Sequence, residues 1–247
     1  MIPVGLAAWL PIQSSLEDFG SDVEILPVLG GPITPIDPGG GRSLVVHSDG
    51  RAGVDPPLPG ALDESRAVAK LVGVEAVSDP ASTPRTVLDG IESAPILHLA
   101  CHGVFDIDPW ASRLRLGDDS LTVRELAERL ASLPAAPPFV ALNACETART
   151  ETLAPEQALG FPSVFVANGA RAVLVTLWPV SDQIAHSIAV QFYRRWAAGA
   201  TAGEALKSAI ITHRSRWPNS TTVDAFCLYG DRSLRFPAER TQSGGPC

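Results

Sequence analysis

Lysine is almost absent from this chain of 247 residues, which has only Lys70 and Lys207 among its 19 basic residues. The chain has 27 acidic residues, so its formal net charge at pH 7 is −8. The basic residues form no cluster along the sequence. Proteins that bind polyanions use Lys and Arg to neutralise phosphates. Nucleic acid and anionic membrane surfaces are therefore not expected as partners. Abundant Ala, Gly, Pro and Arg with little Lys favour a GC-rich, bacterial source.

Long apolar runs and paired cysteines are also missing. No run approaches the roughly 20 residues of a transmembrane helix. The opening MIPVGLAAWLPI has no basic residues and two prolines, which favours a strand over a secretory signal. The cysteines are too few and too scattered for a disulfide framework, and none forms a CxxC pair. The chain is therefore expected in the reducing cytoplasm. The four cysteines are Cys101, Cys145, Cys227 and Cys247.

What the sequence does have is a regular alternation of short apolar runs with helical stretches. This pattern predicts an α/β fold with a doubly wound, mostly parallel sheet and helices on both faces. We expect one domain over residues 1–236 and a disordered tail over 237–247. Strands are expected near 43–48, 74–77, 96–105, 121–123, 139–145, 171–178 and 225–230, with a polar loop over 106–119. Helices are expected near 62–71, 84–91, 124–133, 155–168, 183–198 and 202–214.

Two of the apolar runs end in reactive residues. ILHLACHGVF (96–105) contains His102 and Gly103 near its end, and FVALNACETA (139–148) contains Cys145. In parallel sheets, functional residues lie just beyond the C-terminal ends of the strands, so these residues are expected at one edge. An imidazole beside a thiol favours the nucleophilic thiolate. The amides of Gly103 and Cys145 are expected to bind the oxyanion, since glycine leaves its amide accessible.

Other reactive side chains are interpreted as structural. His98 shares a strand face with His102 but lies deeper, as a core histidine with a local hydrogen bond, while Cys101 packs on the opposite face. A zinc site from Cys101, His102, Cys145 and Cys227 lacks the usual ligand spacing, and neighbouring residues on a strand point to opposite faces. The chain has no GxSxG, no P-loop and no GxGxxG after a strand. No cofactor and no metal is expected.

Seven sequence blocks between about residues 58 and 231 resemble, in order, those of CHAT domains, a branch of the caspase-like (clan CD) cysteine peptidases. The resemblance places the family's catalytic residues on His102 and Cys145, and its oxyanion donors on the amides of Gly103 and Cys145. The chain departs from the common form at Asn143, where serine is frequent, and at Cys101, where threonine is. The blocks are LPGALDES, ILHLACHG, LTVREL, ALNACETA, ANGARAVLVTLWPVSD, FYRRWAAGATAGEALKSA and AFCLYGD.

The resemblance also implies a pocket for P1, the substrate residue before the cleaved bond. In the caspase-like fold this pocket would be formed by residues 48–51, by Asn143 and by the segment from Trp178 to Asp182. Asp182 either points into the pocket, where it would bind a basic P1 side chain, or caps the helix that begins near residue 183. The acidic residues at this edge favour a basic P1 residue, unless they are solvated loop carboxylates. They are Asp106, Asp108, Glu146 and Asp182.

The activity implied by the resemblance is that of a cysteine endopeptidase for protein or peptide substrates, in a regulated bacterial signalling or defence effector. No third catalytic residue can be named from the sequence. The alternative is a CHAT-fold interaction or scaffold module with little turnover. CHAT domains usually follow TPR or other sensor regions, so we expect an excised domain or an effector with a separate sensor protein. Residues 148–157 are expected to form a mobile loop where any self-processing occurs.

Overall fold

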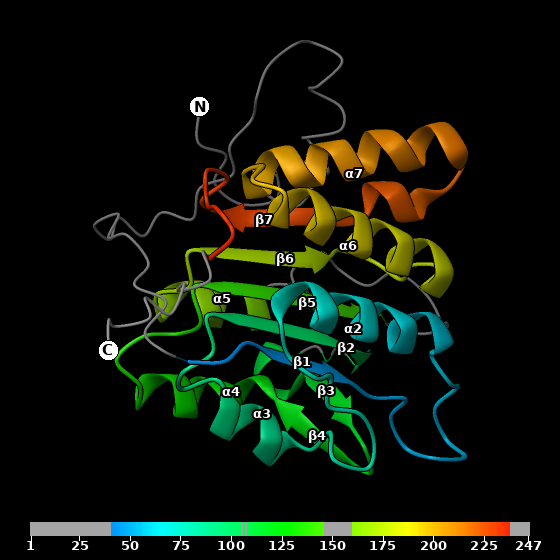
Figure 1. Ribbon diagram of the computed structural model, residues 1–247. Helices are drawn as coiled ribbons and strands as arrows, with labels where there is room; N and C mark the ends of the chain where they lie inside the picture. The colour runs from blue at the N-terminus through cyan, green and yellow to red at the C-terminus, as the bar shows by residue number, and fades with distance from the viewer. Residues whose placement is uncertain (1–40, 105, 107, 146–159, 238–247) are drawn as a thin grey trace, which may run out of the picture.

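The computed structural model describes residues 41–104, 106, 108–145 and 160–237 (Figure 1). Several expectations therefore fall outside the described residues. These concern the strand in the opening segment, Glu146, the loop over residues 148–157, and the tail beyond residue 237. For Cys145 the description covers the backbone.

In the part of the chain that the structure describes, a seven-stranded, mostly parallel sheet forms the centre (Figure 1). Its parallel part runs in the order β1, β2, β5, β6, and β7 closes one edge antiparallel to β6. The strands are β1 (Leu44–His47), β2 (Ile96–Val104), β5 (Phe139–Cys145), β6 (Ala172–Thr176) and β7 (Phe226–Gly230). Each corresponds to an apolar run of the sequence, and β1, β6 and β7 are buried along nearly their whole length. The predicted α/β fold with a mostly parallel sheet is confirmed.

The polar loop expected over residues 106–119 is wrong. It contains the 3₁₀ turn η2 (Pro109–Ala111) and the strand β3 (Arg113–Leu116), which pairs with β4 (Asp119–Thr122) as a hairpin. Leu114 and Leu116 point inward and alternate with partly exposed arginines, and Gly117 has the positive φ of 60° that the tight turn requires. The hairpin pairs with the last residues of β2, beyond the part of β2 that pairs with β1.

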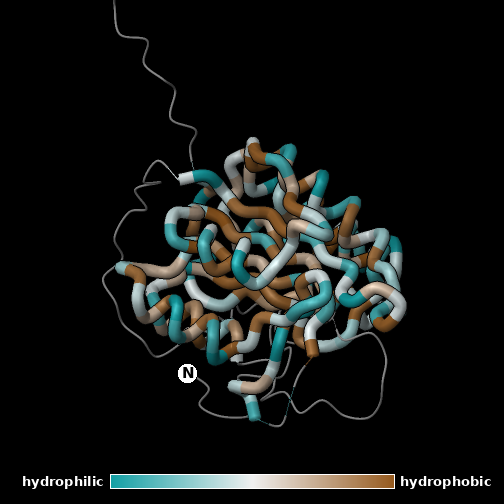
Figure 2. Tube along the Cα trace, turned by 90° about the horizontal axis from the view of Figure 1, so that it is seen from below, coloured by the Kyte–Doolittle hydropathy of each residue, from teal (hydrophilic) through white to brown (hydrophobic). Residues whose placement is uncertain are grey.

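Among the described residues, three helices cover each face of the sheet. On one face lie α2 (Pro59–Val72), α6 (Asp182–Ala197) and α7 (Ala202–Arg216), and on the other α3 (Pro84–Gly90), α4 (Val123–Ala131) and α5 (Gly160–Ala167). Each face has its own apolar core, and Figure 2 shows apolar backbone segments concentrated inside and polar ones around them. The predicted helices on both faces are therefore present. The expected strand at 74–77 is reduced to a single bridge between Val46 and Val77.

Local signals explain where the helices begin and end. Thr122 and Thr201 each form a capping box with the glutamate three residues later, Glu125 and Glu204, and so start α4 and α7. α5 stops before Gly169, whose φ of 99° is one that glycine adopts readily, as predicted for a residue after a helix. The capping boxes provide partners for backbone N–H groups that a helix N-terminus otherwise leaves unsatisfied.

The buried thiol of Cys227 leads to a prediction about alkaline stability. Burial raises its pKa from 9.0 to about 12, partly offset by a hydrogen bond with Tyr229. Below about pH 9 the thiol is protonated in both the folded and the unfolded state. Between about pH 9 and 12 only the unfolded chain releases the proton, so the free energy of unfolding falls by up to about 1.4 kcal/mol per pH unit.

Replacing Cys227 with alanine removes this loss, so the variant is expected to lose stability less steeply than the parent above about pH 9. Urea unfolding at several alkaline pH values measures the difference. Tyr193, whose pKa is raised by burial and by Glu64, titrates in both proteins and cancels in the comparison. Parallel profiles for the two proteins would contradict the prediction.

Candidate active site

The parallel ladder between β2 and β5 brings the two predicted catalytic residues together. His102 and Cys145 are register partners on these neighbouring strands, and Ala100 and Asn143 are the partners two residues earlier. Adjacent strands lie about 4.8 Å apart, so the two backbones are direct neighbours at the C-terminal edge of the sheet. The adjacency expected from the sequence is therefore present in the backbone.

A backbone carbonyl holds the imidazole of His102, which is 3% exposed. Its Nε2 lies 2.8 Å from the carbonyl oxygen of Pro56. A carbonyl can only accept, so Nε2 carries the proton and donates it, and in the neutral ring Nδ1 carries the lone pair. The sequence could not identify this contact, because every residue has a carbonyl and only the path of the chain brings this one to His102.

The residues that follow this carbonyl in the chain are held by two carboxylates. Leu58 donates its N–H to Asp49 Oδ1 at 2.6 Å, and Asp49 in turn lies 3.4 Å from Nε2 of the buried His47. Gly60 and Ala61, at the start of α2, donate their N–H groups to the two carboxylate oxygens of Asp182, at 2.6 and 2.9 Å. Two carboxylates therefore set the position of the Pro56 carbonyl.

Asp182 is the first residue of α6, and that helix has no side-chain cap. Of the two alternatives left open, the cap of α6 is therefore wrong, because the carboxylate satisfies the N-terminal amides of α2 instead. Both of its oxygens are engaged there, which leaves its expected P1 role a matter for experiment. Trp178, the other residue expected in this segment, donates Nε1–H to the carbonyl of Thr221, in the 3₁₀ turn η4 (Thr221–Asp224), at 3.1 Å.

Asp182→Asn is expected to lower stability by about 1 to 2 kcal/mol, because one oxygen becomes a donor and the negative charge at the start of α2 is lost. The P1 preference should stay unchanged. Thermal unfolding and a P1 peptide panel measure the two effects, with the exposed turn variant Asp118→Asn as control. A selective loss of cleavage after Arg, without loss of stability, would instead support the pocket role.

The side chain of Asn143 is held by Glu64, a residue that was not predicted from the sequence. Its Nδ2 donates to Oε2 of Glu64 in α2 at 2.7 Å. Glu64 is fully buried and also contacts His98, which bonds to Tyr193. His98 is thus a core histidine as predicted, but its partners are distant in sequence rather than local. A carboxylate on the apolar stripe of α2, beside Ala61, Ser65 and Val68, was the signal that could have revealed Glu64.

The other residues predicted at or near the site differ in their burial and in their contacts. Gly103 is opposite Leu114, where the hairpin becomes the neighbour of β2. In the loop after β1, Ser48 is buried and bonds to Asp79, whereas Arg51 is exposed. Asp108 caps the turn η2 by accepting from Trp110 N–H, so this acidic residue has a local structural contact. Cys101 is buried in the core on the α5 face, as predicted.

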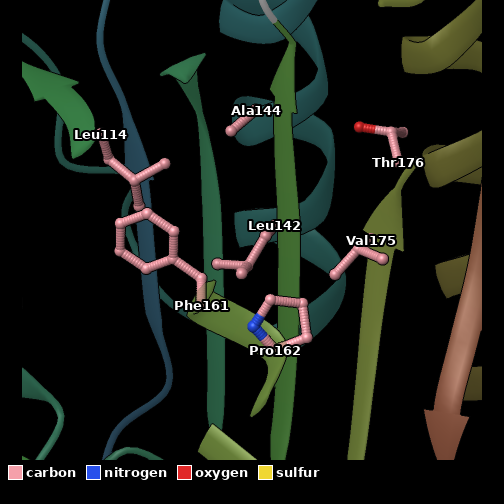
Figure 3. A pocket seen from close by; sticks show the side chains of 7 residues that line it. All are labelled: Leu114, Leu142, Ala144, Phe161, Pro162, Val175 and Thr176. Carbon is pink, nitrogen blue, oxygen red and sulfur yellow. The ribbon is translucent and has the colours of Figure 1, made fainter. Parts of the chain in front are cut away.

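An apolar hollow lies on the other face of β5 (Figure 3). Leu142 and Ala144 alternate with Asn143 along the strand, so the hollow opens on the α5 side and not beside Asn143. It therefore differs from the P1 pocket that the family resemblance implies. The lining residues are Leu114, Leu142, Ala144, Phe161, Pro162, Val175 and Thr176.

Within residues 41–104, 106, 108–145 and 160–237, no group of three or more His, Cys, Asp or Glu is arranged to hold a metal ion. None of the helices in these ranges combines the length and apolar character needed to cross a membrane.

The fold is the caspase-like α/β fold of clan CD cysteine proteases. The chain superposes on the Arg-specific cysteine proteinase gingipain R with a TM-score of 0.52, at 11% identity, over 79% of this chain and 50% of that chain. It superposes on the Saccharomyces cerevisiae separase in a separase–securin complex with a TM-score of 0.50, at 13% identity, over 79% of this chain and 12% of that chain. At these identities the likeness concerns the fold alone.

The chain belongs to the CHAT domain family, whose model matches residues 29–221. It is 24% identical over 210 residues to tetratricopeptide repeat protein 28 of Mus musculus, covering 68% of this chain. The human protein of that name is also 24% identical, over 204 residues and 65% of this chain. The match spans only 8% of the length of either relative.

Proposed function

We propose that this CHAT domain is a cysteine endopeptidase that cleaves protein or peptide substrates with Cys145 and His102. The observation that carries the proposal is the strand register that sets Cys145 opposite His102, whose Nε2 is held by the Pro56 carbonyl. With Nε2–H engaged, Nδ1 is the nitrogen suited to exchange a proton with a thiol.

The proposed reaction consumes one water molecule per peptide bond. Cys145 transfers its proton to His102 Nδ1, and the thiolate attacks the carbonyl carbon, while the amides of Gly103 and Cys145 stabilise the oxyanion. The C–N bond breaks as His102 gives its proton to the leaving amine. Water, deprotonated by His102, then attacks the thioester and releases the acid and the thiolate. Pro56 would hold the ring in the tautomer that both steps need.

The biological role we propose is that of a regulated bacterial effector in signalling or defence, switched by a separate or linked sensor. Its relatives are named for tetratricopeptide repeats, and this chain matches only a small part of them. The same observation favours the second candidate, an interaction or scaffold module with little turnover.

A peptide library incubated with the purified chain, and with Cys145→Ala as control, separates these two functions. Peptidase activity predicts cleavage after a restricted set of P1 residues that is absent from the variant. The scaffold function predicts no cleavage by either protein, under conditions where both are folded by circular dichroism. Equal cleavage by the two proteins would contradict the peptidase proposal.

A further inference from the structure

Glu64 is a carboxylate in a place where an apolar residue would ordinarily stand. It faces the sheet from the apolar side of α2, and its side chain is 0% exposed. Burial of a charged group is strongly unfavourable unless close partners compensate. A core that needed only packing would use Leu or Met here, so the carboxylate calls for a reason beyond packing.

Glu64 has two polar partners in the core, Asn143 and His98, and His98 in turn contacts Tyr193. Burial, and then the charge of Glu64, raise the pKa of Tyr193, so its hydroxyl keeps its proton and can donate to His98 Nδ1, 3.2 Å away. His98 Nε2 then carries the other proton and lies 3.0 Å from Glu64 Oε1, although the N–H is not aligned for a regular hydrogen bond. Asn143 Nδ2 donates to Oε2 at 2.7 Å. The aligned hydrogen bond at the carboxylate thus comes from the neutral amide of Asn143.

This arrangement determines how the amide of Asn143 is turned. A carboxylate can only accept, so the NH₂ group faces Glu64 and the carbonyl oxygen is turned away from it. A neutral partner such as glutamine could pair with the amide in either direction. A carboxylate removes that ambiguity and makes the stronger, charge-assisted bond. Asn143 is two residues before Cys145 on the same strand, so its amide is fixed next to the nucleophile.

We propose that Glu64 is a positioning residue, which fixes the amide of Asn143 and so determines which P1 side chains the site accepts. The inference rests on the proposed peptidase function and deepens it. Glu64 touches neither substrate nor the reacting atoms, and it acts through Asn143. The buried chain from Tyr193 supports the carboxylate from behind, in the way that outer partners orient a residue in a binding site.

The first test is Glu64→Gln, which keeps the shape and removes the charge. Replacing a charge-assisted hydrogen bond with a neutral one weakens the interaction by a free energy that corresponds to about a tenfold change in rate. We expect kcat/KM to fall by about that factor for the best P1 residue, and the P1 profile to broaden because the Asn143 amide turns both ways. Asp63→Asn is the matched control, since it changes a carboxylate to an amide at the preceding residue of α2, where the side chain is exposed.

The second test moves the negative charge from position 64 to position 143, in the double variant Glu64→Gln, Asn143→Asp. His98 can still donate to the carbonyl oxygen of the introduced glutamine, and the NH₂ group of that glutamine can donate to the introduced carboxylate on β5. Every donor keeps an acceptor, so this variant is expected to fold even where Glu64→Gln alone does not. Its negative charge lies on the strand of Cys145, so its P1 preference should shift toward Arg and Lys, by about tenfold or more.

Cleavage of P1-varied peptides and Cys145 labelling by peptidyl acyloxymethyl ketones with the same P1 residues give two independent readouts. The inference is supported by a broadened profile in Glu64→Gln and a basic shift in the double variant. It is overturned if the folded variants keep the P1 profile of the parent and of Asp63→Asn. Failure of the parent both to cleave and to be labelled overturns the peptidase proposal instead, together with the role of Glu64 that rests on it.

Discussion

Cys145→Ala is expected to reduce peptide cleavage to the background of the assay, and His102→Ala to reduce kcat by about 10³-fold or more. The first change removes the nucleophile. The second removes the base that activates it and the acid that protonates the leaving amine, while the oxyanion amides remain. Both residues lie near the C-terminal ends of their strands, at the edge of the sheet, so neither truncation is expected to unfold the domain. Cleavage kinetics, with circular dichroism as a check on folding, measure the two effects.

Two matched variants control for the chemistry of the substitutions. Cys101→Ala changes a buried cysteine that packs on the α5 face, one residue before His102. His213→Ala changes a buried histidine in α7 that stacks on Trp217. Both are expected to lower stability by about 1 to 2 kcal/mol and to leave kcat within about twofold of the parent. Activity retained in Cys145→Ala would refute the assignment of the nucleophile.

The strands that carry the site could be predicted because both faces of a parallel strand are buried. ILHLACHGV and FVALNAC are continuous apolar runs, and the reactive residues stand where each run ends. The β3–β4 hairpin could not be predicted in this way, for the opposite reason. Its first strand alternates Arg113 and Arg115 with the inward-facing Leu114 and Leu116, and the polar half of such an alternation is also typical of a loop.

The contacts around the site were beyond prediction, because they depend on how distant elements pack. Asp182 is 121 residues from Ala61 and Glu64 is 79 residues from Asn143, and no local pattern relates the members of either pair. The Asp182 carboxylate could be assigned to a helix N-terminus from sequence, but not to the right helix. Glu64 carried a weak signal, since a carboxylate on an apolar stripe needs a partner, but that partner could not be named.

Gly60→Ala is expected to impair both stability and activity, although the same change stabilises most helices by about 1 kcal/mol. A Cβ at position 60 would lie 2.6 Å from Asp182 Oδ2 and 2.8 Å from the Asp182 carbonyl oxygen. Since one of these atoms is backbone, the start of α2 must move. Overpacking of this kind costs about 1 to 3 kcal/mol. The shift carries Pro56 away from His102, and a displacement of about 1 Å in a catalytic arrangement can cost about 10²-fold in rate.

Gly199→Ala separates loss of stability from loss of alignment. Gly199 follows α6 with a φ of 100° and has open space around it, so alanine there is strained by its backbone and not by a neighbour. It terminates α6 at the end opposite to Asp182, so its replacement should lower the melting temperature without changing kcat. If Gly60→Ala and Gly199→Ala lose stability to the same degree and only the first loses kcat, the position of the Pro56 carbonyl sets the rate. Equal kcat in the two variants would mean that the Asp182 contact to α2 serves stability alone.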